Sequence, residues 1–239
     1  MDTGIIVDLE TTGIDAEKDR IIEIGIIEFM VSGEHSCPVI SNMYGALEDP
    51  KEELSEDVKK ITGLDDYMLK GQSIDWDLVR SYMERSAIVI AHNMDFDRGF
   101  LQRRKELEGL DPHWACSMKH IDWAAHGFKT RALNYLAADH GFVNSFAHRA
   151  LFDCATTFRL VEPYFQELLA KSYMKEFRVF ATAAPFEAKD KLKSRSYRWD
   201  AAKRVWYKSV MEDTIEDERN FLASEIYSGQ DLHEEVIIS

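Results

Sequence analysis

The stretch Ile5-Ile6-Val7-Asp8-Leu9-Glu10-Thr11-Thr12-Gly13 begins as an apolar strand and carries two carboxylates before it reaches a polar turn. Side chains two residues apart on a strand share a face, so we expect Asp8 and Glu10 to point together while Leu9 points away. Two ionised carboxylates side by side repel and are costly to desolvate, and a hard divalent cation relieves both effects. The pattern therefore predicts a metal site, with a strand that runs out into a polar turn at Thr11-Thr12-Gly13 as the simpler alternative.

A second acidic segment, residues 91–101, follows an apolar run and opens a helical pattern that continues to about Glu108. Its carboxylates, Asp95 and Asp97, lie close to the predicted junction between strand and helix. A charge near the first turn of a helix is mildly favourable, which is sufficient to explain one acid here. The composition of this segment does not distinguish between the two acids.

A third segment, residues 148–153, begins a helical stretch that reaches about Leu169. A regular helix would place His148 and Asp153 roughly 140 degrees apart around its axis. We therefore expect His148 to lie just ahead of the helix and Asp153 to lie inside it. In that arrangement both side chains face one site.

Together the three segments resemble the motifs of the DEDDh exonucleases, the DnaQ-like group that includes the proofreading epsilon subunit of bacterial DNA polymerase III. Residues 8–13 match Asp-x-Glu-Thr-Thr-Gly, residues 91–101 match Ala-His-Asn-x-x-Phe-Asp-x-x-Phe-Leu, and residues 148–153 match His-x-Ala-x-x-Asp. The resemblance covers about residues 1–170. Three blocks in the correct order are far more specific than a lone Asp-x-Glu.

The resemblance implies a catalytic set of Asp8, Glu10, Asp97, His148 and Asp153, and it separates Asp97 from Asp95. The four acids would hold two Mg²⁺ ions about 3.5 to 4 Å apart, one activating water and the other stabilising the leaving oxygen, and Mn²⁺ would substitute. Asp8, Glu10 and Asp153 would ligate the first ion, Asp8 would help to hold the second with the phosphate, and Asp97 would act partly through water. His148 would be the general base, since an imidazole exchanges protons near neutral pH.

The same motifs suggest substrate contacts, each with a structural alternative. The candidates are Leu9, Thr11, Thr12 and Gly13 after the first acids, Ile61 and Thr62 in a loop that would pack on the terminal nucleotide, and His92, Asn93 and Phe96 in the second block. A buried structural role is an equal alternative for His92 and Asn93, and Phe96 has the spacing of a core residue. A helix that ends at Gly63 would explain Ile61 and Thr62 without a ligand.

The order of predicted elements indicates an α/β fold. Three strands come first, followed by alternating helices and strands, which matches a ribonuclease H-like mixed five-stranded sheet flanked by helices. Residues 1–172 are predicted to form this exonuclease domain. The expected elements after the first strand are strands at 20–29 and 38–44, helices at 53–61 and 74–85, a strand at 87–91, a helix after Asp97, a short strand at 114–118 and helices to about 169.

Residues 176–239 are predicted to form a small α+β module. The expected elements are a strand at 177–184, a short helix at 185–194, a hairpin at 197–210, an amphipathic helix at 212–227 and a strand or tail at 232–239. Three sequence segments loosely resemble a small module of unknown function that is appended to plasmid and phage DNA-processing proteins. They are residues 185–191, 197–200 and 205–207. Ser196 departs from that pattern, which has glycine at this position.

The charge of the chain is unevenly placed. The whole chain carries −14, yet residues 189–208 carry +6 and the remainder carries −20. Basic residues interleaved with aromatic ones suit a nucleic-acid strand, because cations bind phosphates and rings stack on bases. The candidate grip consists of Lys193, Arg195, Arg198, Trp199, Arg204 and Trp206. Alternatively, the aromatic residues form the core of the module and the bases form a solvated face.

The remaining features indicate a cytoplasmic enzyme. No apolar run is long enough to span a membrane, the N-terminus shows no secretory pattern, and three scattered cysteines argue against a disulfide framework or a zinc site. The predicted function is 3'-to-5' hydrolysis of DNA with a free 3' end to nucleoside 5'-monophosphates, with a replication or repair protein as a possible partner. The alternatives are RNA trimming and an accessory or proofreading subunit that acts mainly through its partner.

Overall fold

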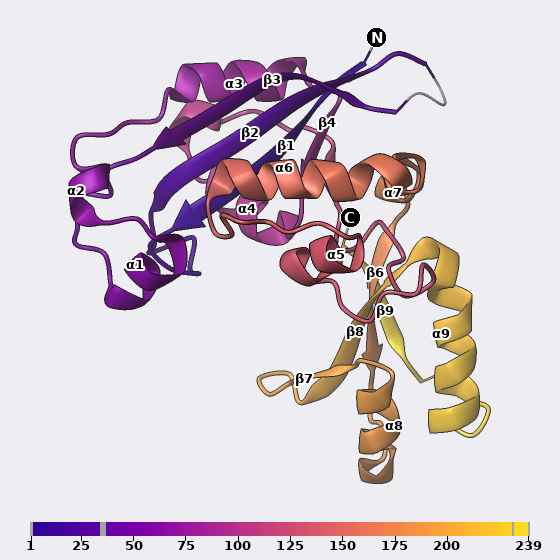
Figure 1. Ribbon diagram of the computed structural model, residues 1–239. Coiled ribbons are helices and arrows are strands. Elements are labelled where there is room, and N and C mark those ends of the chain that lie inside the picture. The colour runs from indigo at the N-terminus through magenta and orange to yellow at the C-terminus, as the bar shows by residue number, and fades with distance from the viewer. Residues whose placement is uncertain (1, 34–36, 231, 239) are drawn as a thin grey trace. The chain divides into compact units, whose positions relative to one another are not determined.

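The computed structural model describes residues 2–33, 37–230 and 232–238. Met1 and Ser239, at which the two predicted domains begin and end, lie outside these ranges. The chain divides into two compact units, one ending at Ser172 and the other beginning at Tyr173. The first unit contains the three acidic motifs, and the second contains the basic, aromatic segment (Figure 1).

The first unit is built on a mixed five-stranded sheet with the strand order β3-β2-β1-β4-β5. The first three strands form an antiparallel meander, and the last two run parallel to β1. The predicted fold class is thereby confirmed. The strands are β1 (Asp2–Thr11), β2 (Ile21–Val31), β3 (Val39–Leu47), β4 (Ile88–Ala91) and β5 (Trp114–Cys116).

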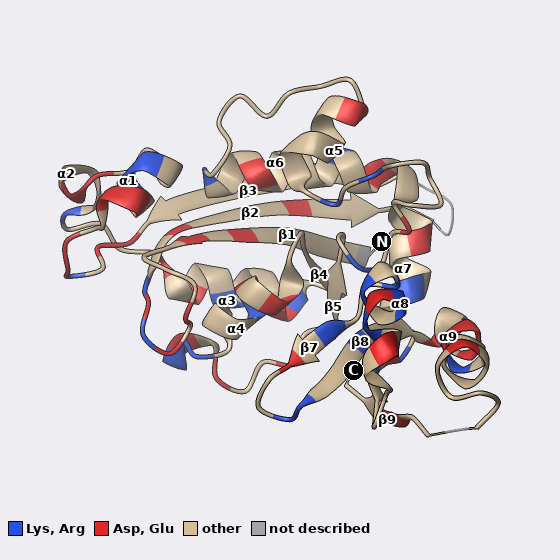
Figure 2. Ribbon diagram, turned by 90° about the horizontal axis from the view of Figure 1, so that it is seen from below, with Lys and Arg blue, Asp and Glu red and all other residues tan. Residues whose placement is uncertain are grey.

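Helices cover both faces of this sheet, with α3 and α4 on one side and α5 and α6 on the other (Figure 2). The helices of the first unit are α1 (Glu56–Thr62), α2 (Asp66–Leu69), α3 (Trp76–Arg85), α4 (Met94–Leu101), α5 (Leu133–Asp139), α6 (Ala150–Val161) and α7 (Phe165–Ser172). Within the described ranges, no helix combines the length and apolar character that a membrane crossing requires.

The alternation of side chains along β1 positions the acidic motif. Ile5, Val7 and Leu9 are buried in the cluster that includes residues of α3 and α4. Ile6 is buried in the opposite cluster, which includes residues of α6 and α7. Because side chains alternate along a strand, Asp8 lies on the same side as Ile6, beneath α6. The central strand therefore fills two apolar cores and still presents carboxylates to one helix.

Several helix boundaries differ from the sequence prediction, including that of α1, which begins at Glu56 rather than at residue 53. The helix after β4 begins at Met94, ahead of Asp97, and ends at Leu101 rather than near Glu108. Arg104 adopts extended dihedrals there, and a short 3₁₀ turn follows before the chain enters β5. The stretch predicted as helical to about residue 169 is interrupted by a 3₁₀ turn at Glu162–Tyr164. Pro163 lies in that turn, where its missing N–H interrupts the helical hydrogen bonds.

The second unit is a four-stranded antiparallel sheet with the order β7-β8-β6-β9. The predicted hairpin is present as β7 and β8, but the helix predicted for 212–227 is shorter, since a 3₁₀ turn precedes it and a π turn follows it. The elements are β6 (Glu176–Ala181), α8 (Lys189–Ser194), β7 (Arg198–Asp200), β8 (Val205–Met211), α9 (Ile215–Phe221) and β9 (Glu234–Ile237). Its core contains Val179, Leu192 and Leu222.

Candidate active site

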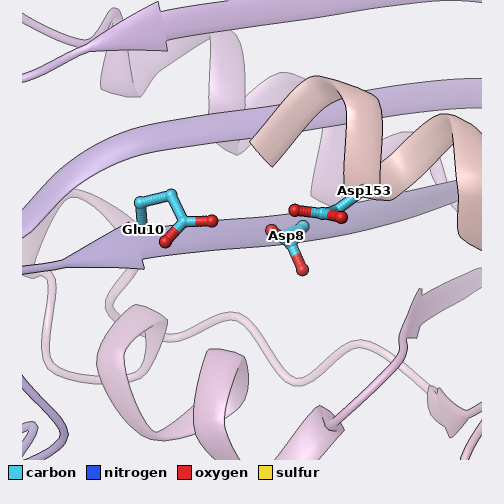
Figure 3. Close-up of side chains that lie close together, drawn as sticks. All are labelled: Asp8, Glu10 and Asp153. Atoms are coloured by element: carbon cyan, nitrogen blue, oxygen red, sulfur yellow. The ribbon is translucent and has the colours of Figure 1, made fainter. Parts of the chain in front are cut away.

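Three of the predicted catalytic carboxylates converge between β1 and α6. Asp8 and Glu10 extend from β1, Asp153 extends from α6, and the three side chains point toward one another (Figure 3). One oxygen of each lies within 4.8 Å of the others. Asp153 is buried and the other two are partly buried. The expectation that Asp8 and Glu10 share a face is confirmed, and the distances suit ligands of a common cation.

The approach of α6 to the sheet depends on a glycine. Gly25 of β2 pairs with Asp8 of β1, directly beneath the first turn of α6. A Cβ atom on Gly25 would lie 2.4 Å from the carbonyl carbon of Ala150 and 2.5 Å from the nitrogen of Leu151. Any larger side chain would therefore push the helix away. Cys154 fixes the same contact, because its Sγ donates to the Gly25 carbonyl oxygen at 3.2 Å.

The convergence of these acids raises their affinity for protons. Burial, followed by the charges of Asp153 and Glu23, raises the pKa of Glu10 from 4.5 to about 8. Burial and the neighbouring carboxylates, Asp97 first among them, raise the pKa of Asp8 well above its ordinary value. A cation among these groups would offset the repulsion and keep them ionised at neutral pH.

Asp97 of α4 lies beside this cluster, since its charge contributes to the raised pKa of Asp8. Asp97 is 2% exposed, and the backbone N–H groups of Asp97 itself and of Leu9 only partly offset the effect of its burial on the pKa. Burial raises its pKa above the ordinary value. Among the described residues, its Oδ1 has no hydrogen-bond partner. An unpartnered, buried carboxylate oxygen beside three further acids fits a group that acts on a bound cation or its water. Asp95, in contrast, is exposed and pairs with Lys119 at 2.8 Å.

His148 precedes α6, as expected, and is exposed. Its backbone has a φ of 61°, which lies in the left-handed region that non-glycine residues seldom adopt. Asn144 earlier in the same loop donates to Asp153 Oδ1 at 2.6 Å. The loop that carries His148 is therefore tied by a hydrogen bond to Asp153, one of the three converging carboxylates. No feature of the sequence pointed to Asn144.

Glu23 and Arg149 are further residues of the site that sequence reasoning missed. Glu23 lies opposite Glu10 in the β1–β2 register. Its carboxylate accepts a hydrogen bond from the guanidinium of Arg149 at 3.0 Å. Arg149 directly follows His148 in the sequence. One signal was available: Glu23 interrupts the apolar run of Ile21, Ile22 and Ile24.

Two of the predicted substrate-binding residues, His92 and Thr62, make hydrogen bonds within the protein. Both ring nitrogens of His92 are occupied, Nδ1 by the Ser117 hydroxyl at 2.8 Å and Nε2 by the Arg131 carbonyl at 2.7 Å. Burial lowers the pKa of His92 to about 4, so the ring is neutral at physiological pH. Thr62 is buried and donates to the Val58 carbonyl. The structural alternative is therefore favoured for both residues.

The other predicted contacts divide between turn, core and surface. Thr11 donates to the Gly13 carbonyl, and Thr12 accepts the N–H of Arg20, so both hydroxyls stabilise the turn after β1. Leu9 is buried in the core that faces α3 and α4, and Phe96 packs against that core. Asn93 is exposed ahead of α4, and Ile61 is 55% exposed at the end of α1. Asn93 and Ile61 thus remain accessible to a ligand.

The predicted grip does not form a single surface. Arg195 is bound to the buried Glu218 at 3.1 Å, and Trp206 packs against the module core beside its cross-strand partner Trp199. Arg198 pairs with Tyr207, which alternation places on the opposite face of the sheet. Arg204 is exposed in the β7–β8 turn, and Lys193 is exposed on α8.

The architecture and the acidic cluster agree with comparisons of this chain with known proteins. The model of the exonuclease family, RNase T, matches residues 5–161. The chain therefore belongs to the exonuclease family, and the enzyme class predicted from the sequence, a 3'-to-5' exonuclease, is confirmed at the level of that family. The matched range includes all three acidic motifs.

Similar proteins include DNA polymerases. The DNA polymerase III PolC-type of Listeria innocua is 30% identical over 202 residues, which span 78% of this chain and 14% of that polymerase. The DNA polymerase III subunit epsilon of Aquifex aeolicus is 29% identical over 175 residues, or 71% of this chain and 83% of the subunit. The chain thus spans only a small part of the PolC-type relatives.

The solved structures that share the fold include two exonucleases in complex with DNA. Exonuclease X in complex with 5' overhanging duplex DNA has a TM-score of 0.50 and 23% identity, covering 67% of this chain and 89% of its own. Exonuclease I of E. coli in complex with a dT13 oligonucleotide has a TM-score of 0.55 and 14% identity, covering 74% of this chain and 48% of its own.

Proposed function

We propose that this chain is a divalent-metal-dependent 3'-to-5' exonuclease that acts on DNA in the cytoplasm and releases nucleoside 5'-monophosphates. The observation that carries the proposal is the convergence of Asp8, Glu10 and Asp153 within 4.8 Å, with the buried Asp97 beside them. Three converging acids with a fourth beside them are costly in the absence of a cation, and this donor set of carboxylate oxygens suits Mg²⁺ or Mn²⁺.

Each residue of the cluster has a distinct role in this proposal. Two ions held here would activate a water molecule and stabilise the leaving oxygen. Asp8, Glu10 and Asp153 would hold the first ion, Asp8 would also contribute to the second, and Asp97 would contribute through water. His148 would accept the proton of the attacking water, and its exposed position leaves the ring accessible to substrate and solvent. Asn144 would keep Asp153 oriented.

DNA is favoured because the relatives are named as DNA polymerase III proteins and two structures with the same fold were solved with DNA. The direct test uses purified protein with oligonucleotides of DNA and of RNA, labelled at either end, in Mg²⁺, Mn²⁺ or EDTA. We expect stepwise shortening of 5'-labelled DNA in either metal, immediate release of label from 3'-labelled DNA, and no cleavage in EDTA.

The same experiment distinguishes the alternatives. Faster shortening of RNA than of DNA would identify an RNA-trimming enzyme of the same family. Internal cleavage, or shortening from the 5' end, would contradict the proposed polarity. Activity that persists in EDTA would contradict the metal requirement.

A second candidate function is that of a proofreading or accessory subunit, and its support is the likeness to the epsilon subunit of DNA polymerase III. Such a protein would have slow turnover alone and faster turnover with its polymerase. Affinity purification of the tagged chain from its own cells, followed by the nuclease assay on the recovered complex, tests this function. Equal turnover with and without co-purified proteins would reject it.

The second unit is proposed to bind single-stranded nucleic acid on the sheet face that carries Arg198, Tyr207 and Phe180. These residues are paired across β7, β8 and β6, so they lie on one face. The Lys203 ammonium lies 5.4 Å from the Phe180 ring centre, which adds a cation to this aromatic surface. Rings and cations in alternation bind bases and phosphates without sequence preference.

Replacing Arg198 and Arg204 together with alanine is expected to weaken binding of a single-stranded oligonucleotide and to reduce its salt slope by about 1 for each phosphate that is no longer neutralised. Fluorescence anisotropy between low and moderate salt measures both quantities. The Lys189→Ala/Lys193→Ala pair is the control, since it removes the same charge from α8. Equal weakening in the two double variants would show that net charge, rather than this face, controls binding.

A further inference from the structure

Glu23 is a fifth carboxylate beside the acidic cluster, and the three motifs give it no role. It pairs with Glu10 across β1 and β2, so the two side chains leave the same face of the sheet. Its side chain is 8% exposed. A buried carboxylate next to Glu10 adds repulsion to a site that already has four acids, and specific interactions must offset that cost.

Those interactions all lie at the start of α6. Oε1 of Glu23 accepts from Arg149 Nε at 3.1 Å and from Nη2 at 3.0 Å. Oε2 accepts from Arg149 Nε at 3.1 Å and from the backbone N–H of Ala150 at 3.2 Å. Both oxygens are therefore engaged by the chain, and Glu23 is not among the acids whose oxygens converge.

The start of α6 depends on this contact. The residue at its N-cap position, Arg149, makes no side-chain capping hydrogen bond to the helix. The first N–H groups of a helix need acceptors, and a negative charge near them is favourable. The carboxylate of Glu23 meets both needs from the neighbouring strand, by accepting the Ala150 N–H while its charge is balanced by Arg149.

The same short segment carries the chemistry. The backbone passes from left-handed at His148, with φ of 61°, to extended at Arg149, with φ of −127°, and then enters the helix that holds Asp153. A change of this kind over three residues persists only where the surroundings fix it. Arg149 and Ala150, the two residues held by Glu23, lie between His148 and Asp153.

We propose that Glu23 is a positioning residue of the exonuclease site. Through Arg149 and the Ala150 amide, its carboxylate holds the segment that presents His148 and Asp153 to Asp8 and Glu10. Glu23 acts on the substrate only through these groups. This inference rests on the proposed function for its catalytic consequence, whereas its structural consequence is independent of any reaction.

The test compares Glu23→Ala with a matched variant, Glu28→Ala. Glu28 lies on the same strand, is also buried and binds a single arginine, with Arg85 Nε at 2.6 Å from its Oε1. It pairs with Ile5, away from the acidic cluster. Each variant loses a buried ion pair with one arginine, and only Glu23→Ala should disturb the start of α6.

Two measurements are made on each variant. Amide hydrogen exchange at residues 150–153 in the metal-free protein should accelerate at least roughly tenfold in Glu23→Ala and remain unchanged in Glu28→Ala. In the nuclease assay, kcat of Glu23→Ala should fall roughly 10- to 100-fold while KM for DNA changes little, because a small misplacement of catalytic groups has that effect. Glu23→Gln retains one oxygen for the Ala150 N–H, so it should recover part of kcat and of the protection.

The outcomes separate this inference from the proposed function. Unchanged amide exchange at 150–153 in Glu23→Ala, or an equal decrease of kcat in Glu28→Ala, would overturn the positioning role. If Glu23→Ala does not fold, Glu23→Gln and Arg149→Met give the same comparison with smaller changes. A native chain that cleaves no nucleic acid would overturn the proposed function and leave the exchange result to decide the role of Glu23 at the start of α6.

Discussion

Replacing Asp8 with asparagine is expected to abolish nuclease activity and, in the absence of metal, to raise the thermal stability of the protein. Asp8 is the acid on which both proposed ions depend, so its removal should lower kcat/KM by roughly 10³- to 10⁴-fold, the equivalent of several kcal/mol of charge stabilisation. The same substitution removes one charge from a cluster in which Glu10, Asp97 and Asp153 all raise the pKa of Asp8. Function and stability should therefore change in opposite directions.

The pH dependence of the metal-free protein follows from the same shifts. The pKa of Glu10 is about 8 in the folded chain and 4.5 ordinarily, so the folded state binds this proton more tightly than the unfolded state. The resulting stability is fully present below about pH 4.5 and is lost as the pH rises through 8. In the presence of a chelator, the melting temperature of the native chain should therefore fall between about pH 4.5 and 8, and the fall should be smaller in Asp8→Asn.

Thermal denaturation with and without Mg²⁺ checks this prediction alongside the nuclease assay. The native chain should gain several degrees with metal at pH 8, since about 1 kcal/mol shifts a chain of this size by roughly 2 to 4 °C, and Asp8→Asn should gain less. Asp95→Asn is the control, because Asp95 is an exposed acid paired with Lys119. If Mg²⁺ does not change the melting temperature of the native chain, or if Asp8→Asn retains nuclease activity, the proposed metal site would be contradicted.

The acidic motif was predictable because its physical basis is local. A strand alternates its side chains, so Asp8 and Glu10 share a face whatever the rest of the chain does. The choice of Asp97 rather than Asp95 as the catalytic acid came from motif resemblance. The structure also distinguishes the two residues, since Asp97 is buried and Asp95 forms an exposed ion pair with Lys119. The meander of the first three strands also followed from the sequence, because no long helix was predicted between them.

The supporting contacts were not predictable, since they join residues far apart in the chain. The role of His92 depends on the carbonyl of Arg131, 39 residues later, and the role of Glu23 depends on Arg149, 126 residues later. No periodicity encodes such pairs. The prediction of the nucleic-acid grip was incomplete for a related reason. The sequence shows that basic and aromatic residues alternate between 189 and 208, but it does not show that Glu218 of another helix neutralises Arg195.

His148 is predicted to be the general base, and replacing it with asparagine should lower kcat roughly 10²- to 10⁴-fold. Asparagine tolerates the left-handed backbone that His148 adopts at φ of 61°, so the loop should retain its conformation while losing a side chain that can accept a proton. His148 is exposed, and the three converging carboxylates that would hold the metal do not include it. The gain in protein stability with Mg²⁺ and the affinity for DNA should therefore be nearly unchanged.

The decisive measurement for His148 separates turnover from binding. Single-turnover rates and DNA dissociation constants, the latter measured in Ca²⁺ to slow hydrolysis, should show a decrease in the rate alone. His126→Asn is the control, because His126 is bound to Glu167 at 2.6 Å and lies outside the cluster of Asp8, Glu10 and Asp153. If His148→Asn instead weakens DNA binding and retains its single-turnover rate, the histidine contacts substrate without accepting the proton. The base would then be hydroxide from solvent, and the rate of the native chain should rise with pH without a plateau.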